Sequence, residues 1–197
     1  MNHAKGARAP GDEAQGREVA ETPEMPEVLQ TERLRLRWFH PSDAPWILAL
    51  LNSPGWLNQI GDRGVHDLER AAEWIDERLV GNYHRQGHGF WAVEERSTGA
   101  PVGMCGLVHR PGLPDVDLGY AFLPEAWGRG LAREAARACL AHGHEVLGLR
   151  RILAITRPGN AASLAVLAAI GMQPAGEVCL PGEPRLQRLF ESLHPGR

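Results

Sequence analysis

The sequence predicts a mixed α/β or α+β fold, in which helices flank one central sheet. Short segments that alternate apolar and polar residues indicate half-buried strands. Other segments place apolar residues on one helical face, as amphipathic helices do. Strands and helices alternate late in the chain, which gives the order β-α-α-β-β-β-α-β-α-β-β.

The folded domain is predicted to span residues 28–197, after a flexible tail formed by residues 1–27. The tail is rich in Ala, Gly, Pro and Glu, so it cannot bury enough apolar surface to offset its ordering entropy. The rest of the 197-residue chain is long enough for one domain with a hydrophobic core.

The first half supplies a strand and two helices. Leucines alternate with arginines in TERLRLRWF, so a strand begins at Thr31. Ser42 and Asp43 precede an apolar run, which favours a helix start. Glycines between positions 55 and 64 indicate a loop, and a second helix follows over Asp67–Tyr83.

The same periodicities predict the later elements. Strands are expected at Gly89–Glu95, Pro101–His109, Asp115–Leu123, Arg151–Thr156, Gln173–Leu180 and Arg185–Glu191. Helices are expected at Leu131–Leu147 and Ala161–Ile170.

The composition excludes several classes of protein. A net charge of -3 gives no overall attraction to nucleic acid or anionic lipid. No apolar run approaches the roughly 20 residues that span a bilayer, and no secretory signal is visible, so a cytoplasmic protein is expected. Three scattered cysteines without a CxxC pair favour buried, reduced thiols over a disulfide framework or a zinc site.

The segment from Phe122 to Ala136 combines a strand end, a glycine-rich loop and a helix start. Gly128 and Gly130 let the backbone turn tightly and approach a ligand. The first helical N–H groups have no internal acceptor and the helix dipole is positive there, so the loop suits an anion such as a pyrophosphate. Arg129 can add a charge-assisted contact at the rim.

Two glycines alone are also compatible with a plain strand-to-helix turn. A Walker loop is excluded because no Gly-Lys-Ser/Thr follows the glycines. A Rossmann fingerprint fits poorly, since the motif comes late, after three strands that read as antiparallel.

The stretch DLGYAFLPEAWGRGLAREAA resembles motif A of the GNAT N-acetyltransferase superfamily. The family's phosphate loop, Q/R-x-x-G-x-G/A, falls on Trp127, Gly130 and Ala132. Trp127 replaces Gln or Arg, as is typical of the Rim-type branch of ribosomal-protein N-terminal acetyltransferases.

The stretch RRILAITRPGNAASLAVLAAIGM resembles a second signature of this branch, through Asn160, Ser163 and Gly171. Met172 departs from the usual Phe. The opening TERLRLRWFHPSDA is also similar to the branch, so the resemblance covers about residues 30–191.

The resemblance implies the GNAT fold: a mostly antiparallel sheet of about six to seven strands with a V-shaped splay, flanked by about four helices. It also implies acetyl-CoA as cosubstrate and no metal. Loop amides would bind the pyrophosphate, and the strand edge at Phe122 would pair with the pantetheine arm. The cofactor-binding residues by match are Phe122, Leu123, Trp127, Gly128, Arg129, Gly130, Leu131, Ala132, Asn160 and Ser163.

By the same resemblance, Ser163 protonates the leaving thiolate, although a serine at a helix start also bonds to local backbone. Leu167 stands where many relatives have a catalytic tyrosine. Asp117 is the candidate base, acting directly or through water; the alternative is a solvated carboxylate at a strand end. Glu134 is expected to be a structural, solvated helix charge.

The implied activity is acetyl transfer to a primary amine, on a protein N-terminus or a small molecule. The least family-like parts form the acceptor cleft, so the sequence does not identify the acceptor. An acyl-CoA-binding module without catalysis and a scaffold protein are the alternatives. Relatives often form homodimers, and the sequence leaves the oligomeric state open.

Overall fold

The computed structural model describes residues 26–183 and 185–194, arranged around one eight-stranded sheet. The strands are β1 (Glu27–Gln30), β2 (Leu34–Arg37), β3 (Phe90–Glu95), β4 (Pro101–Val108), β5 (Asp117–Phe122), β6 (Arg151–Thr156), β7 (Gln173–Val178) and β8 (Gln187–Leu193). Their order is β1-β2-β3-β4-β5-β6-β8-β7, and only β5 and β6 pair in parallel. The mixed, mostly antiparallel fold is confirmed, with one strand more than expected.

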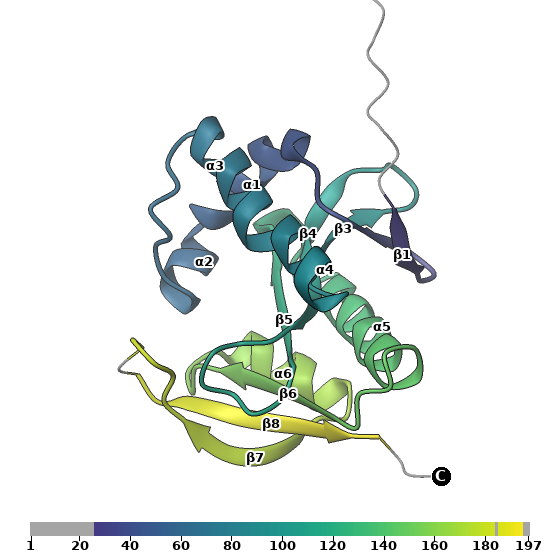
Figure 1. Ribbon diagram of the computed structural model, residues 1–197, viewed down its shortest axis with the longest axis vertical. Coiled ribbons are helices and arrows are strands. Elements are labelled where there is room, and N and C mark those ends of the chain that lie inside the picture. The colour runs from purple at the N-terminus through teal and green to yellow at the C-terminus, as the bar shows by residue number, and fades with distance from the viewer. Residues whose placement is uncertain (1–25, 184, 195–197) are drawn as a thin grey trace, which may run out of the picture.

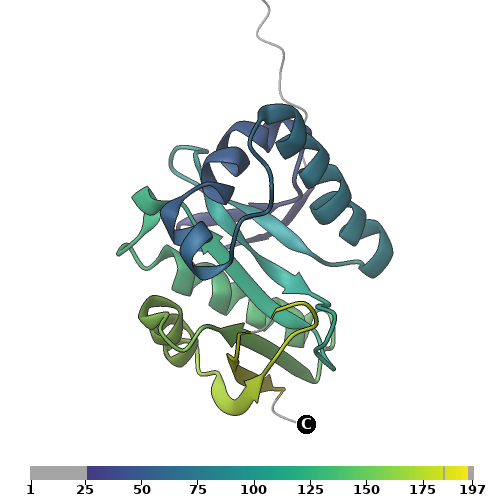
Figure 2. The ribbon, with the colours of Figure 1, turned by 90° about the vertical axis from the view of Figure 1, so that its left-hand side faces the viewer.

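The helices lie on both faces of the sheet (Figure 1). They are α1 (Ala44–Leu51), α2 (Pro54–Gln59), α3 (Leu68–Trp74), α4 (Gly81–Gln86), α5 (Leu131–Glu145) and α6 (Ala161–Ala169), with short helices η1 (Pro41–Asp43), η2 (Ile75–Val80) and η3 (Pro124–Ala126). Helix α5 packs against β4 and β5 and contacts α6, while α1 to α4 cover the other face (Figure 2). No helix within the described ranges is long and apolar enough to cross a membrane.

Two elements differ from the sequence prediction. Glu27, assigned to the tail, opens the added strand β1, which pairs with β2; the remainder of the predicted tail, residues 1–25, lies outside the described residues. Helix α2 occupies part of the predicted glycine loop. Ser53 caps it by accepting a hydrogen bond from the Trp56 amide, and proline follows the cap, which together favour a helix start.

The predicted helix over Asp67–Tyr83 is confirmed as one helical run, from α3 through the π-helical η2 into α4. Asp67 caps its start by accepting from the Arg70 amide, and Gly87 ends it in the left-handed conformation with φ 73°.

Strand β2 follows the expected alternation, with Leu34 and Leu36 fully buried. The alternation would place Arg37 on a solvated face of the strand. Instead, its guanidinium is paired with Asp43 and Glu94, whose side chains are buried. These two carboxylates compensate the buried charge and anchor the start of α1 to the sheet.

The cysteines agree only in part with the expectation of buried thiols. Cys105 on β4 and Cys139 on α5 are buried, with their sulfur atoms 3.4 Å apart. Cys179 is exposed.

Candidate functional site

The site is organised by the divergence of β5 and β6. These strands share a single register pair, Asp117 with Leu153, and the Leu153 amide donates to the Val116 carbonyl at 2.9 Å. Beyond this point β5 pairs with β4 alone. Backbone groups on the other edge of β5 are therefore available to an extended ligand.

The glycine-rich loop lies between β5 and α5, as the sequence predicts, and follows the short helix η3. Gly128 and Gly130 both have positive φ, 71° and 75°, and α5 begins at Leu131. The Leu131 side chain is buried, which fixes the start of α5 against the core. A hollow of about 390 Å³ lies between this loop and α6, lined by Gly128, Arg129, Gly130, Arg133, Ala165, Val166 and Ala169.

Trp127 ties the loop to the strand and to α2. Its indole N–H donates to the Phe122 carbonyl at 2.8 Å, which closes the turn through Leu123. Its ring lies so close to Gly55 that a Cβ there would come within 2.7 Å of the ring. Trp127 is nevertheless 54% exposed, so it forms a wall of the loop rather than part of the core.

Two arginines line the hollow, Arg129 and Arg133, and the uncompensated charge is not on the expected one. Arg129 is ion-paired with Glu95, and its carbonyl accepts from Arg33 at 2.9 Å, so its charge is already compensated. Arg133 lines the hollow and forms no hydrogen bond or ion pair with another described residue. Arg133, in the first turn of α5, therefore supplies the uncompensated charge.

Glu134 is structural, as predicted, but it is not simply solvated. Its carboxylate accepts hydrogen bonds from the Thr31 hydroxyl at 2.6 Å and from the Arg33 amide at 2.9 Å, and it pairs with the Arg33 guanidinium. These contacts fasten the turn before β2 to the start of α5. Burial raises the pKa of Glu134, but the bonds to Thr31 and Arg33 outweigh it and lower the pKa.

The start of α6 brings two predicted residues together. The Asn160 side-chain oxygen accepts from the Ser163 amide at 3.1 Å and caps the helix, which leaves the Asn160 amide nitrogen for a ligand. The Ser163 hydroxyl lies 2.9 Å from the hydroxyl of Tyr120 on β5. Burial raises the Tyr120 pKa to about 12, so this phenol is protonated at neutral pH.

Asp117 is 1% exposed, so the solvated alternative is wrong. The Arg110 guanidinium donates to its carboxylate at 3.1 Å. Burial raises the pKa of Asp117, and Arg110 opposes this shift only in part. Because side chains alternate along a strand, Asp117 and Tyr120 project from opposite faces of β5. The predicted pair Asp117 and Ser163 is therefore separated by the strand.

Sequence reasoning missed two residues of the site. The sequence could have indicated the position of Tyr120, because the period of two places its side chain on the face of β5 opposite Asp117. Arg133 follows Gly130 by one helical turn, but only the ion pair between Arg129 and Glu95, which lie far apart in the sequence, leaves Arg133 as the uncompensated cation.

A family model described as an acetyltransferase (GNAT) domain matches residues 33–173. The uncharacterized protein YkkB of Bacillus subtilis (strain 168) is 34% identical over 147 residues, which cover 73% of this chain and 84% of YkkB. The uncharacterized N-acetyltransferase YoaA of the same organism is 29% identical, over 76% of this chain and 84% of YoaA.

Solved structures show the same architecture. An acetyltransferase from Agrobacterium tumefaciens str. C58 superposes with a TM-score of 0.72 at 29% identity, over 90% of this chain and 99% of that one. The ribosomal L7/L12 alpha-N-protein acetyltransferase RimL, solved in complex with coenzyme A, shares the fold with a TM-score of 0.71 at 18% identity, over 85% of this chain and 98% of that one.

Proposed function

The chain belongs to the GNAT acetyltransferase family and is an N-acetyltransferase, and from this premise we propose how it works. It binds acetyl-CoA along the loop and the open edge of β5. It transfers the acetyl group directly to a primary amine in a ternary complex, without a covalent enzyme intermediate. The amine belongs to a protein N-terminus or to a small molecule.

The residues at the loop fit the cosubstrate. Space is open beside Gly128, where no heavy atom lies within 4 Å of the position that a Cβ would occupy. Arg33 and Arg133 approach the corresponding position at Gly130 to 3.6 and 3.7 Å. An anionic pyrophosphate matches this combination of open backbone amides and guanidinium groups.

The remaining contacts follow from the same match. The amides of Gly128, Arg129, Gly130, Leu131 and Ala132 would bind the pyrophosphate, while the edge at Phe122 and Leu123 and the Asn160 amide would hold the arm. When bound, acetyl-CoA supplies an activated acetyl thioester.

Three side chains would then accept or donate the protons of the reaction. On the face covered by α1 to α4, Asp117 accepts a proton from the amine, directly or through water. On the opposite face, the hydrogen-bonded pair Tyr120 and Ser163 holds a proton available for the departing sulfur. Here a tyrosine on β5 takes the place of the helical tyrosine that Leu167 replaces.

The observation that carries the proposal is the divergence of β5 and β6 after a single register pair. Acetyl-CoA bound along the unpaired edge of β5 would lie between the face that holds the glycine-rich loop and the face that holds Asp117. A donor on one face and an amine on the other would meet there.

Calorimetric titration with acetyl-CoA, followed by a thiol-release screen of amine acceptors, tests the proposal. We expect micromolar binding and turnover of at least one amine class. Absence of acetyl-CoA binding at high micromolar concentration contradicts the proposal. Binding without turnover on any amine favours the alternative, a catalytically inactive acyl-CoA-binding module.

A further inference from the structure

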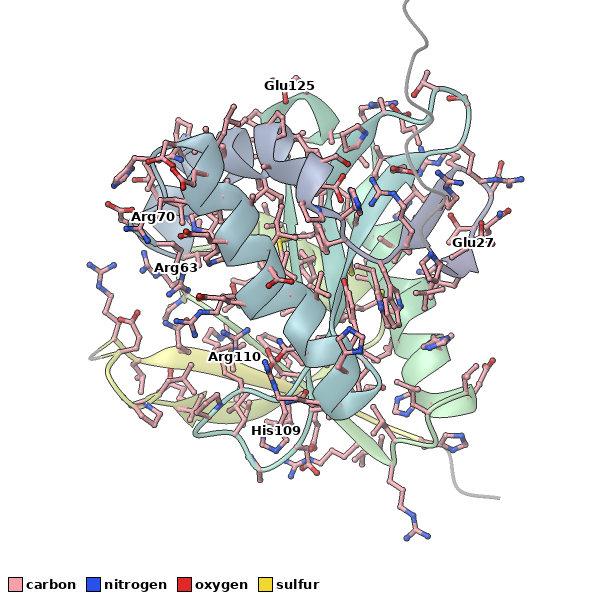
Figure 3. The ribbon with its side chains drawn as sticks, turned by 45° about the horizontal axis from the view of Figure 1, so that its top comes forward. Glu27, Arg63, Arg70, His109, Arg110 and Glu125 are labelled. Carbon is pink, nitrogen blue, oxygen red and sulfur yellow. The ribbon has the colours of Figure 1, made fainter. Side chains whose placement is uncertain are left out.

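Arg63 interacts electrostatically with two further arginines, Arg78 and Arg110, and none of the three is a proton donor or acceptor in the proposed reaction. Arg63 lies in the loop between α2 and α3, Arg78 lies in η2, and Arg110 follows β4. Figure 3 shows Arg63 and Arg110 on the side of the α3–α4 run that faces the last hairpin. Segments far apart in the sequence thus place positive charge along one surface.

This charge is poorly compensated. Within residues 26–183 and 185–194, neither Arg63 nor Arg78 forms an ion pair or a side-chain hydrogen bond. Arg63 is exposed, but partial desolvation by its neighbours lowers its pKa, and repulsion by Arg110 and Arg78 lowers it further; Glu183 opposes these effects only in part. An oxyanion would relieve this repulsion, and a guanidinium group matches carboxylate and phosphate geometry.

The cluster adjoins the proposed reaction site. Arg110 is paired with Asp117 at 3.1 Å. A guanidinium nitrogen of Arg110 also lies 3.8 Å from the position that a Cβ on Gly119 would occupy, on the part of β5 that has diverged from β6. An amine that reaches Asp117 would therefore lie beside Arg110, and Arg63 interacts electrostatically with Arg110.

We propose that the acceptor amine carries an anionic group, a carboxylate or a phosphate, and that Arg63 binds this group with Arg78 beside it. This inference rests on the proposed acetyl transfer. Arg110 is assigned a different part, because Asp117 already engages its charge. Cationic acceptors such as polyamines would be repelled by the same cluster.

The kinetic test compares amines matched in length: 4-aminobutyrate with butylamine and putrescine, and phosphoethanolamine with ethanolamine. The anionic member of each set should have a kcat/KM about tenfold higher, the size expected for one charge-assisted hydrogen bond. The two sets distinguish a carboxylate from a phosphate. Equal or better use of the neutral and cationic amines overturns the inference and leaves acetyl transfer intact.

Substitutions of single arginines test which side chain produces the preference for anionic amines. Arg63→Gln should abolish the anionic advantage, and Arg63→Glu should reverse it toward putrescine. Arg70→Gln is the control, because it also removes one positive charge, but from an α3 arginine that is already paired with Glu73 at 3.0 Å. This variant should keep the preference for anionic amines. Unchanged acetyl-CoA affinity in each variant shows that it is folded.

A binding measurement makes the inference independent of turnover. The protein saturated with coenzyme A is titrated with inorganic phosphate while the arginine side-chain N–H signals are followed by NMR. We expect saturable shifts at Arg63 that weaken about tenfold in Arg78→Gln. If these shifts appear and no amine is acetylated, acetyl transfer fails and the anion site stands. Absence of a response at Arg63 overturns the inference.

Discussion

The phenol hydroxyl of Tyr120 on β5 lies 2.9 Å from the Ser163 hydroxyl at the start of α6, and it also bonds to the Ser163 carbonyl at 3.2 Å. This pair joins the two elements that diverge around the open edge of β5. It places a protonated phenol next to the serine that the resemblance assigns to the leaving group. The site therefore contains a two-residue arrangement rather than an isolated serine.

Tyr120→Phe should lower kcat by about 10²-fold, because the Ser163 hydroxyl loses its hydrogen-bond partner in proton transfer. Acetyl-CoA affinity should stay unchanged, since the ring remains in place. Steady-state kinetics and calorimetry separate the two effects. Tyr83→Phe is the matched control, because the Tyr83 hydroxyl is also buried but bonds to the backbone of Phe90. A full-rate Tyr120→Phe enzyme would show that the pair is only structural.

Asp117→Asn should remove most of the activity and abolish the acidic limb of the kcat/KM profile. In the wild type this limb should lie above the ordinary carboxyl pKa of 3.8, because burial raises the pKa of Asp117. An identical pH profile in the variant would exclude Asp117 as the base.

The contribution of Asp117 to the pH dependence of wild-type stability has a definite sign, and Asp117→Asn should remove it. A raised native pKa contributes stability that is fully present below 3.8 and is lost as the pH rises through the native pKa. Asp117→Asn lacks this loss, so its unfolding free energy at neutral pH should stay within about 1 kcal/mol of wild type, although Arg110 loses its partner. Urea unfolding across pH measures the difference.

Gly130→Glu should weaken acetyl-CoA binding by about 10²-fold or more, because a negative side chain enters the anion site. Gly148→Glu is the matched control, since Gly148 also has a positive φ, 66° against 75°, but lies beyond the C-terminal end of α5. Both variants bear similar backbone strain, of order 1 kcal/mol. Calorimetry should separate them, and equal affinities would show that the loop is misassigned.

Asn160 should have two separable roles. Asn160→Ala removes the helix cap and should destabilise the protein by about 1 kcal/mol, whereas Asn160→Asp keeps an oxygen that accepts from the Ser163 amide. Both variants lack the side-chain N–H donor, so both should bind acetyl-CoA about tenfold more weakly. Full affinity in Asn160→Asp would mean that Asn160 acts only as a cap.

The sequence could predict most of the fold because strands and helices have local signals. The period of two in β2, the Asp67 cap and the glycines before α5 each involve a few neighbouring residues. Strand β1 was missed because its four residues gain order only from pairing with β2. Helix α2 was missed because Gly55 indicated a loop, whereas that glycine makes room for the Trp127 ring.

The sequence by itself determined the glycine loop at the start of α5 and the Asn160–Ser163 helix start, because both depend on residues close together in the chain. Only the tertiary structure decided which charges and hydroxyls are free to act. Arg129 meets Glu95 across 34 positions and Tyr120 meets Ser163 across 43, and no local pattern records such contacts. The burial of Asp117 and the divergence of β5 from β6 likewise depend on how distant strands pack.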